Sequence, residues 1–456
     1  MLSETAAFMN IIVFFTDQQR WDTLGVHGST LGLTPNLDRF ARQGTFFREA
    51  VTPQPVCGPA RSCLQTGQYA TTTGVWRNGF GLSEESPKLA ECFNAAGYRT
   101  GYIGKWHLSE GTGPGPVPAA NRGGYQDWLG ANCVELTSGP YSPRLWDEDE
   151  QEQPLNGYRS DAMVDAAIRY IDQRSQEPEQ PFMLWLSLLE PHHQNTDDSY
   201  PAPHGHERDH LAAPLPPDLQ SLGGSAAKDW AGYCAMIQRI DQGLGRLNDA
   251  LESTGLSEDT MLVFISDHGC HFKTRNSEYK RSPHDVSLRV PMVFWGQQWN
   301  GGGEHACAAS LVDLAPTLLE AAGLEVPPTM QGQSLLPVRQ GLAAARPRAS
   351  YSQFGDIGMA PGRCLRTSRW KYAVTAADEY RSQATAPVYH ETHLYDLQTD
   401  PYELVNLVEL ESHRSVCDDF REMLLERMQC VGEPSAEILS PSNLRPARQR
   451  TIDYPA

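Results

Sequence analysis

Four short apolar runs, each followed directly by polar side chains, constrain the fold of this chain more than any other feature. The runs cover residues 11–15, 98–103, 182–189 and 261–265. Continuous apolar stretches of this length are typical of parallel strands that are buried on both faces of a sheet. Between them, three- and four-residue apolar spacing, as over 233–251, predicts amphipathic helices. We therefore predict an α/β fold with a large, mostly parallel sheet sandwiched by helices.

The polar side chains that follow these runs are all capable of chemistry. They are Asp17 and Gln18, Lys105 and His107, His192 and His193, and Asp267 and His268. In open α/β sheets, ligands bind beyond the carboxyl ends of the parallel strands. We therefore expect the four strand ends to meet at one site.

Asp17 and Asp267 each follow a predicted strand and each has a second potential metal ligand beside it, Gln18 or His268. Two carboxylates, an amide oxygen and an imidazole form a mostly oxygen ligand set for one divalent cation. Such a set suits Ca²⁺, while the imidazole leaves Mn²⁺ or Mg²⁺ open.

The segment 57–67 predicts one short helix, with Pro59 suited to its first position and Gly67 to its end. Cys57 then lies at the helix N-terminus. Free amide N–H groups and the helix dipole would attract an anion there and lower the pKa of the thiol. The plainer interpretation is a buried structural cysteine, as expected for most of the other nine.

The charge composition of the chain limits which binding partners are expected. The 456 residues carry a net charge of -19, from 37 Lys and Arg against 56 Asp and Glu. This balance argues against nucleic acid and against an anionic membrane as partners, so an anionic substrate needs a local basic pocket. The first nine residues lack a signal-peptide pattern, and the sequence therefore predicts a cytoplasmic protein. If a signal peptide was removed, we expect a periplasmic or secreted protein instead. The ten scattered cysteines predict reduced thiols.

Three motifs carry a family resemblance. Cys57-Gly58-Pro59-Ala60-Arg61 fits C-x-P-x-R, residues 104–108 read G-K-W-H-L, and residues 190–193 read E-P-H-H. The chain resembles the formylglycine-dependent type I sulfatases of the alkaline phosphatase superfamily, in particular the bacterial carbohydrate sulfatases. The resemblance implies that a formylglycine-generating or anaerobic maturation enzyme converts Cys57 to formylglycine. It also implies the alkaline phosphatase-like fold, with a mixed, mostly parallel sheet.

The resemblance further implies a role for each motif residue. Formylglycine at position 57 would attack the sulfur of a sulfate ester and, with its oxygen, join the metal ligands. Arg61 would orient it, and Lys105 and Lys280 would bind the sulfate. His107 would act as the base, and His192, with His193 as the alternative, would protonate the leaving alcohol. We expect the rest of the substrate to contact His193, Gln194, Asn195, His271 and His284.

Two positions depart from the commonest family pattern. Many members carry Asp where this chain has Gln18, and Asn where it has His268. A histidine at the later position resembles iduronate sulfatases, choline sulfatases and phosphonate monoester hydrolases. The favoured substrate is a carbohydrate sulfate. The alternatives are an aryl sulfate, a phosphonate monoester or phosphodiester, and a non-catalytic protein that binds sulfated glycans.

The resemblance also divides the chain. It implies a catalytic domain over residues 9–345 and a smaller α+β C-terminal subdomain over 346–440. Segments 363–372, 393–397 and 400–407 match that subdomain, which consists of a small antiparallel sheet and a packed helix. Residues 441–456 form a Pro- and Arg-rich tail. The oligomeric state stays open, with a homodimer as one option.

Overall fold

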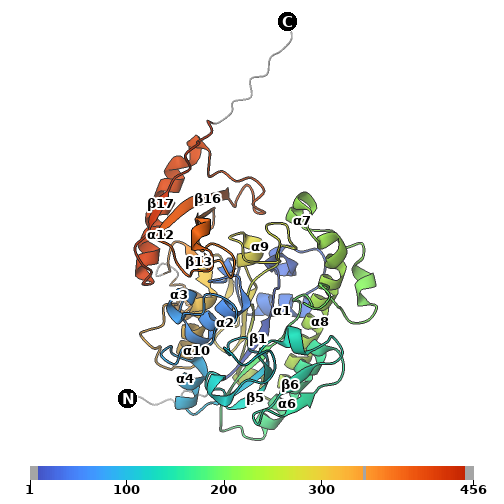
Figure 1. Cartoon of the computed structure of the whole chain (residues 1–456). Coiled ribbons are helices and arrows are strands. Elements are labelled where there is room, and N and C mark those ends of the chain that lie inside the picture. Colours follow the sequence, from blue (N-terminus) through green and yellow to red (C-terminus); the bar gives the residue numbers. More distant parts are fainter. Residues whose placement is uncertain (1–8, 343–345, 447–456) are drawn as a thin grey trace.

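The computed structural model describes residues 9–342 and 346–446, and a ten-stranded sheet forms its centre (Figure 1). The strand order is β11-β2-β10-β9-β1-β8-β4-β5-β6-β7. The four central strands are parallel: β9 (Thr260–Ser266), β1 (Asn10–Thr16), β8 (Phe182–Ser187) and β4 (Arg99–Lys105). All four predicted strands are thus present, side by side.

The outer strands make the sheet mixed. β10 (Met292–Gly296) runs antiparallel to β9, and β6 (Arg144–Trp146) runs antiparallel to β5 (Asp127–Ala131). The remaining strands are β2 (Thr45–Phe47), β7 (Glu152–Pro154) and β11 (Gly303–His305). β1 and β9 extend one residue beyond their predicted bounds at each end, β4 continues to Lys105, and β8 stops at Ser187.

Alternate residues of β1 face opposite helical layers. Ile11, Val13 and Phe15 belong to one buried cluster with side chains of α2 (Cys57–Thr66), α4 (Leu89–Ala95) and α10 (Leu314–Ala321). Ile12 and Phe14 belong to a second cluster with α1 (Pro35–Gln43), α6 (Arg159–Ser175) and α8 (Ala226–Ser253). Helices therefore cover both faces, as a sheet with two buried faces requires.

Shorter helices lie in the connections between these elements. They are α3 (Ala70–Thr73), α5 (Val134–Thr137), α7 (Pro217–Leu222), α9 (Asp285–Leu288) and α11 (Leu336–Arg339). A two-stranded sheet pairs β3 (Ala50–Val51) with β12 (Ala309–Ser310). No helix among the described residues is both long and apolar enough to cross a membrane.

A second, five-stranded sheet follows in the C-terminal part. Its antiparallel strands are β13 (Ser350–Phe354), β14 (Gly362–Arg366), β15 (Trp370–Ala376) and β16 (Val388–Asp396). β17 (Glu437–Leu439) pairs parallel to β16, and α12 (Arg414–Cys430) packs on the sheet. The predicted small sheet and its helix are present. The predicted tail over 441–456 lies outside the described residues from 447 onward.

Candidate active site

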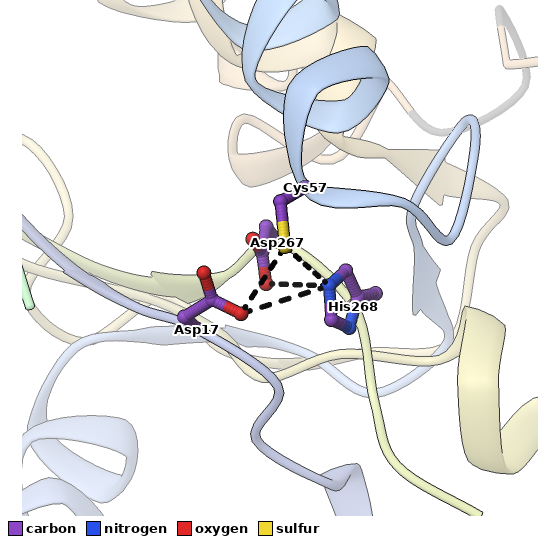
Figure 2. A group of neighbouring side chains, drawn as sticks. All are labelled: Asp17, Cys57, Asp267 and His268. Carbon is purple, nitrogen blue, oxygen red and sulfur yellow. Dashed lines mark hydrogen bonds and ion pairs between the residues drawn. The ribbon is translucent and has the colours of Figure 1, made fainter. Parts of the chain in front are cut away.

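The carboxyl ends of β1 and β9 meet the N-terminus of α2 at a buried group of four side chains (Figure 2). Cys57, the first residue of α2, points toward Asp17, Asp267 and His268. Its Sγ lies 3.6 Å from Asp17 Oδ1 and 3.4 Å from His268 Nε2. His268 Nε2 in turn lies 3.4 Å from Asp267 Oδ1. Residues from three distant parts of the sequence therefore share one space.

Helix α2 is buried along its whole length, and it ends at Gly67, whose φ of 64° suits glycine. It begins at Cys57, so Pro59 is its third residue and not its first. The N–H of Gly58 donates to Asn78 Oδ1 at 2.9 Å, and Pro59 has no N–H to donate. The helix amides thus contribute less to the anion site than the sequence suggested, and other groups supply the positive charge.

Two lysines supply that charge. Lys280 Nζ lies 2.8 Å from Cys57 Sγ, and Lys105 Nζ lies 3.7 Å from the same atom. Burial raises the pKa of the Cys57 thiol, but Lys105, Lys280 and His268 outweigh burial and hold that pKa well below its ordinary value. An anion at residue 57 is therefore stabilised by cations aimed at it.

Arg61 links the carboxylates of Asp17 and Asp267 to residues at the ends of β4 and β8. Its Nη2 donates to Asp17 Oδ2 at 3.0 Å, and its Nε lies 3.6 Å from Asp267 Oδ2. Its Nη1 donates to the Lys105 carbonyl at 2.6 Å and to Ser187 Oγ at 2.8 Å. Because Arg61 is one turn of α2 from Cys57, the helix positions the guanidinium and the thiol together.

The donor atoms fit a divalent cation. Among the described residues, Gln18 Oε1 and Asp267 Oδ2 are buried without a hydrogen-bond partner. Gln18 Nε2 donates to Tyr200 Oη at 2.9 Å, and His268 Nδ1 lies 2.9 Å from the Gly269 carbonyl, which leaves His268 Nε2 facing the site. Burial and the charge of Asp17 raise the pKa of Asp267 to about 7. A cation among these atoms would pair the orphaned oxygens and relieve the repulsion between the carboxylates.

Two histidines border the same space. His192 Nδ1 lies 2.6 Å from the His193 carbonyl, and its Nε2 lies 3.3 Å from Lys280 Nζ. Burial lowers the pKa of His192. Burial also lowers the pKa of His107, but hydrogen bonds to Cys133 and Cys57 outweigh it and raise that pKa to about 10. The two imidazoles therefore differ in proton affinity in the unmatured protein.

Glu135, which no sequence motif indicated, also borders the site and is 5% exposed. Its Oε1 lies 3.1 Å from Lys105 Nζ and 3.8 Å from His107 Nδ1. Glu135 lies in α5, just after β5, and no motif surrounds it. The only available signal was its place after a strand, and β5 is too short and too mixed in composition to stand out.

Two of the residues predicted to contact substrate are buried. Gln194 is buried, with its Nε2 donating to the Glu135 carbonyl and its Oε1 accepting from Arg159. His284 is buried with its ring nitrogens 3.2 Å from Ser282 Oγ and from Tyr395 Oη. These two side chains make hydrogen bonds inside the protein, and their contact with substrate stays a prediction.

The other three residues predicted to contact substrate, His193, Asn195 and His271, differ in exposure. His271 is fully buried, and its Nε2 lies 2.9 Å from the Lys280 carbonyl, so it supports the lysine. His193 is half-buried and lies between the rings of His192 and Tyr279, both with centroids 4.3 Å away. Asn195 is exposed. His193 and Asn195 are therefore the more exposed of the predicted substrate contacts.

Comparison with solved structures places the fold. A structure in complex with its substrate D-glucosamine-2-N,6-O-disulfate has a TM-score of 0.74 and 22% identity, covering 93% of this chain and 98% of that one. Phosphonate monoester hydrolase of Agrobacterium radiobacter has a TM-score of 0.67 and 21% identity, covering 92% and 96%. The same architecture thus serves sulfate and phosphonate chemistry.

Comparison of sequences is more specific. Ulvan-active sulfatase of Formosa agariphila is 27% identical, over 93% of this chain and 82% of its own. N-acetylglucosamine-6-O-sulfatase of Bacteroides thetaiotaomicron is 24% identical, over 87% and 82%. The N-sulphoglucosamine sulphohydrolase C-terminal model matches residues 278–430, and the sulfatase model matches residues 9–324. With more than half of its length matched by that model, the chain belongs to the sulfatase family.

Proposed function

We propose that this sulfatase hydrolyses a sulfate monoester of a carbohydrate to an alcohol and inorganic sulfate, with formylglycine made from Cys57 as its nucleophile. The observation that carries the proposal is the placement of Lys280 Nζ 2.8 Å and Lys105 Nζ 3.7 Å from Cys57 Sγ. Two buried ammonium groups facing one reactive atom suit a sulfate ester, in a chain whose net charge of -19 offers no general attraction for anions. The carbohydrate assignment draws on relatives named for ulvan and N-acetylglucosamine sulfates.

The proposed division of labour follows the geometry. Cys57 Sγ marks the position of the formylglycine oxygens, and the matured residue supplies a hydrated aldehyde whose oxygen attacks sulfur. Lys105 and Lys280 hold the sulfate oxygens and offset the charge that develops on them. Arg61 holds Asp17 in place through the 3.0 Å bond between Nη2 and Oδ2.

Proton transfers fall to the two histidines. His192 presents Nε2 to the site because its Nδ1 is held at 2.6 Å by the His193 carbonyl. A bound sulfate anion would raise the pKa that burial has lowered, so His192 could protonate the leaving alcohol. His107 takes the remaining proton of the hydrate as the base. Its raised pKa comes in part from the hydrogen bond to Cys57, and conversion of Cys57 to formylglycine removes that cause. A formylglycine-generating or anaerobic maturation enzyme is the partner that this scheme requires.

We assign the metal site to Asp17, Gln18, Asp267 and His268, with Ca²⁺ as the favoured ion and Mn²⁺ or Mg²⁺ as alternatives. A bound cation would polarise the sulfate oxygens. Ca²⁺ at about 100 times its dissociation constant should stabilise the fold by about 2.7 kcal/mol. A thermal melt in EDTA and in Ca²⁺ measures this directly. Gln18→Ala should reduce the stabilisation, and identical melting curves of the unsubstituted protein in EDTA and Ca²⁺ would contradict the site.

The division of the chain is part of the same proposal. Residues 9–345 form the catalytic domain, which supplies every side chain of the scheme, and residues 346–440 form a subdomain that supports it. The contacts between the two parts involve the segment that carries Lys280, since Arg281 Nη2 lies 2.9 Å from Asp356 Oδ2.

A substrate panel tests the function. Matured protein is assayed for release from 4-nitrophenyl sulfate, N-acetylglucosamine 6-sulfate, ulvan oligosaccharides and 4-nitrophenyl phenylphosphonate. We expect a higher kcat/KM on at least one sugar sulfate than on the aryl sulfate, and a lower one on the phosphonate. A phosphonate preference would favour the hydrolase that shares the fold, and an aryl sulfate preference a simple arylsulfatase. Binding of sulfated sugar with no release from any ester would indicate a non-catalytic binding protein.

A further inference from the structure

A cavity of about 400 Å³ shares Tyr200 with the surroundings of the proposed active site. Its lining comes from the first turns of α8 and from the loops around residues 140–141 and 199–211. We call it the Tyr141 pocket. None of the residues assigned above to catalysis or metal binding lines it. Its size falls in the range of small-molecule sites, and neither the proposed chemistry nor the metal accounts for it.

Two stacked rings form one side of the Tyr141 pocket. Tyr141 and His204 lie with ring centroids 4.4 Å apart and planes 11° from parallel. The His204 N–H donates to Tyr141 Oη at 2.8 Å, which holds the loop that carries one ring against the other. Tyr141 is 42% exposed. A fixed and exposed aromatic surface next to a cavity suits the apolar C–H face of a pyranose ring, which packs flat on such surfaces.

A buried carboxylate, that of Asp229, also lines the Tyr141 pocket. Asp229 is 4% exposed, and its Oδ2 has no hydrogen-bond partner among the described residues. Its Oδ1 lies 3.9 Å from Lys228 Nζ, beyond hydrogen-bond length. A buried oxygen without a donor is costly, and a sugar hydroxyl is a donor of the right kind. The pocket is lined by two carboxylates, Asp229 and Glu207, and by one lysine, Lys228. This excess of negative charge disfavours a sulfated sugar unit and favours a neutral one.

Tyr200 joins the Tyr141 pocket to the active site. It lines the pocket, and its hydroxyl accepts from Gln18 Nε2 at 2.9 Å. Its ring centroid lies 6.2 Å from that of His193, which stacks on His192. The pocket is therefore separated from the proposed leaving-group side of the site by one aromatic side chain.

We propose that the Tyr141 pocket binds a neutral pyranose unit of the substrate glycan, while the sulfated unit occupies the active site. That the bound sugar belongs to a substrate rests on the proposed function. Binding of a neutral sugar in the pocket can nevertheless be tested without turnover. Tyr141 and His204 pack against the ring, and Asp229 accepts a hydroxyl hydrogen. The pocket thus selects a glycan longer than the sulfated monosaccharide.

Saturation-transfer NMR tests the binding. The probes are methyl glycosides of glucose, galactose, mannose and rhamnose, each at millimolar concentration with the full chain. We expect transfer to at least one glycoside, loss of that transfer in Tyr141→Ala, and its retention in Tyr141→Phe, which keeps the ring. Weaker saturation transfer to the glycoside in Asp229→Asn would support the contact between the Asp229 carboxylate and a sugar hydroxyl. No transfer to any of the four glycosides, or transfer unchanged by Tyr141→Ala, would overturn the proposal.

Turnover of 4-nitrophenyl sulfate by the same matured proteins separates this proposal from the proposed function. We expect equal kcat/KM for Tyr141→Ala and the unsubstituted protein, because the aryl ester does not reach the pocket, and this equality also shows that the variant is folded. On a sulfated oligosaccharide Tyr141→Ala should lose about tenfold in kcat/KM, mainly through KM. A parallel loss on both esters would contradict a separate subsite. If neither protein released sulfate from any ester, the proposed function would fail while the NMR comparison still decided whether the pocket binds sugar.

Discussion

Three buried cations, Arg61, Lys105 and Lys280, lie around Cys57 together with the buried carboxylates of Asp17 and Asp267. The charge of Lys105 is paired with two carboxylates: its Nζ lies 2.8 Å from Asp17 Oδ2 and 3.1 Å from Glu135 Oε1. Buried charges at this density persist only when each is paired. Lys280 differs, because its Nζ has no carboxylate within ion-pair distance among the described residues and lies nearest to Cys57 Sγ. It is therefore the cation most available to a substrate anion.

Lys280→Ala should lower kcat/KM for a sulfate ester by about 10²- to 10³-fold, because it removes a positive charge aimed at the reacting group. Steady-state kinetics on 4-nitrophenyl sulfate measure the loss. Lys273→Ala is the matched control, since Lys273 precedes Lys280 on the same segment and pairs with the exposed Asp198 at 2.6 Å. It should change kcat/KM less than twofold. Comparable losses in both variants would count against a specific role for Lys280.

His271 makes stability depend on pH. Burial lowers its pKa from 6.5 to about 4, so the folded protein holds it neutral while the unfolded chain takes up a proton near pH 6.5. Its contribution to stability is therefore complete above pH 6.5 and declines as pH falls toward 4, with a loss of about 2 kcal/mol at pH 5. His271→Gln keeps a donor for the Lys280 carbonyl but cannot titrate. Denaturant unfolding at pH 7.5 and 5 should show a smaller acid loss in this variant.

The control for that comparison is His390→Gln, at an exposed position of β16. It should leave the acid loss unchanged. If His271→Gln lost as much stability between the two pH values as the unsubstituted protein, another group would be responsible for the acid sensitivity.

At the scale of elements, the ends of the strands determine where the chemistry lies. β4 ends at Lys105, and the preceding residue, Gly104, has a φ of 110°. A Cβ on Gly104 would lie 1.9 Å from the Ser187 carbonyl oxygen of β8. Only glycine lets β4 and β8 approach this closely while the chain turns Lys105 toward Asp17.

Gly104→Ala should therefore destabilise the fold by more than about 2 kcal/mol, through both strain at positive φ and a backbone clash. It should also lower activity, because Lys105 and His107 follow directly. Gly111→Ala is the matched control, with a φ of 72° but open space around the new Cβ. It should cost about 1 kcal/mol from backbone conformation alone. Equal shifts in the denaturant midpoint would show that the contact between β4 and β8 is looser than described.

At the scale of the molecule, a buried charge network joins the two sheets. Asp285, at the start of α9, accepts from Arg366 Nε at 3.0 Å and pairs with Lys371. Lys371 Nζ also lies 3.0 Å from Glu403 Oε1. Burial raises the pKa of Asp285, but Arg366 and Lys371 outweigh burial and hold it well below its ordinary value. The C-terminal sheet is thus fastened to the segment that carries Lys280.

Asp285→Asn should destabilise the protein by about 3 kcal/mol, because it leaves buried cations short of one negative charge. Arg369→Met, which removes an exposed pair with Asp396, should cost less than about 1 kcal/mol. Urea unfolding of both variants measures the difference. A loss in Asp285→Asn no larger than that in Arg369→Met would mean that the network contributes little to holding the two sheets together.

The sequence was most informative where local pattern decides structure. Apolar runs indicated the four central strands, and the side chains after them meet at Cys57, because carboxyl ends of parallel strands share one edge of a sheet. Pairing between distant short strands, such as β2 with β11, could not be read, since a three-residue strand carries no period. Gln194 and Glu135 show the same limit at the site. Which polar side chain faces a ligand and which pairs with a neighbour depends on contacts between loops far apart in the chain.

The chemical state of residue 57 decides whether this chain works as a formylglycine sulfatase. Preparations with different degrees of maturation are compared by the mass of the peptide that contains residue 57 and by the turnover of a sulfate ester per mole of protein. Turnover should rise in proportion to the fraction of formylglycine, and it should be absent at zero conversion and in Cys57→Ala. Full turnover from protein that retains an unmodified Cys57 would contradict the formylglycine mechanism.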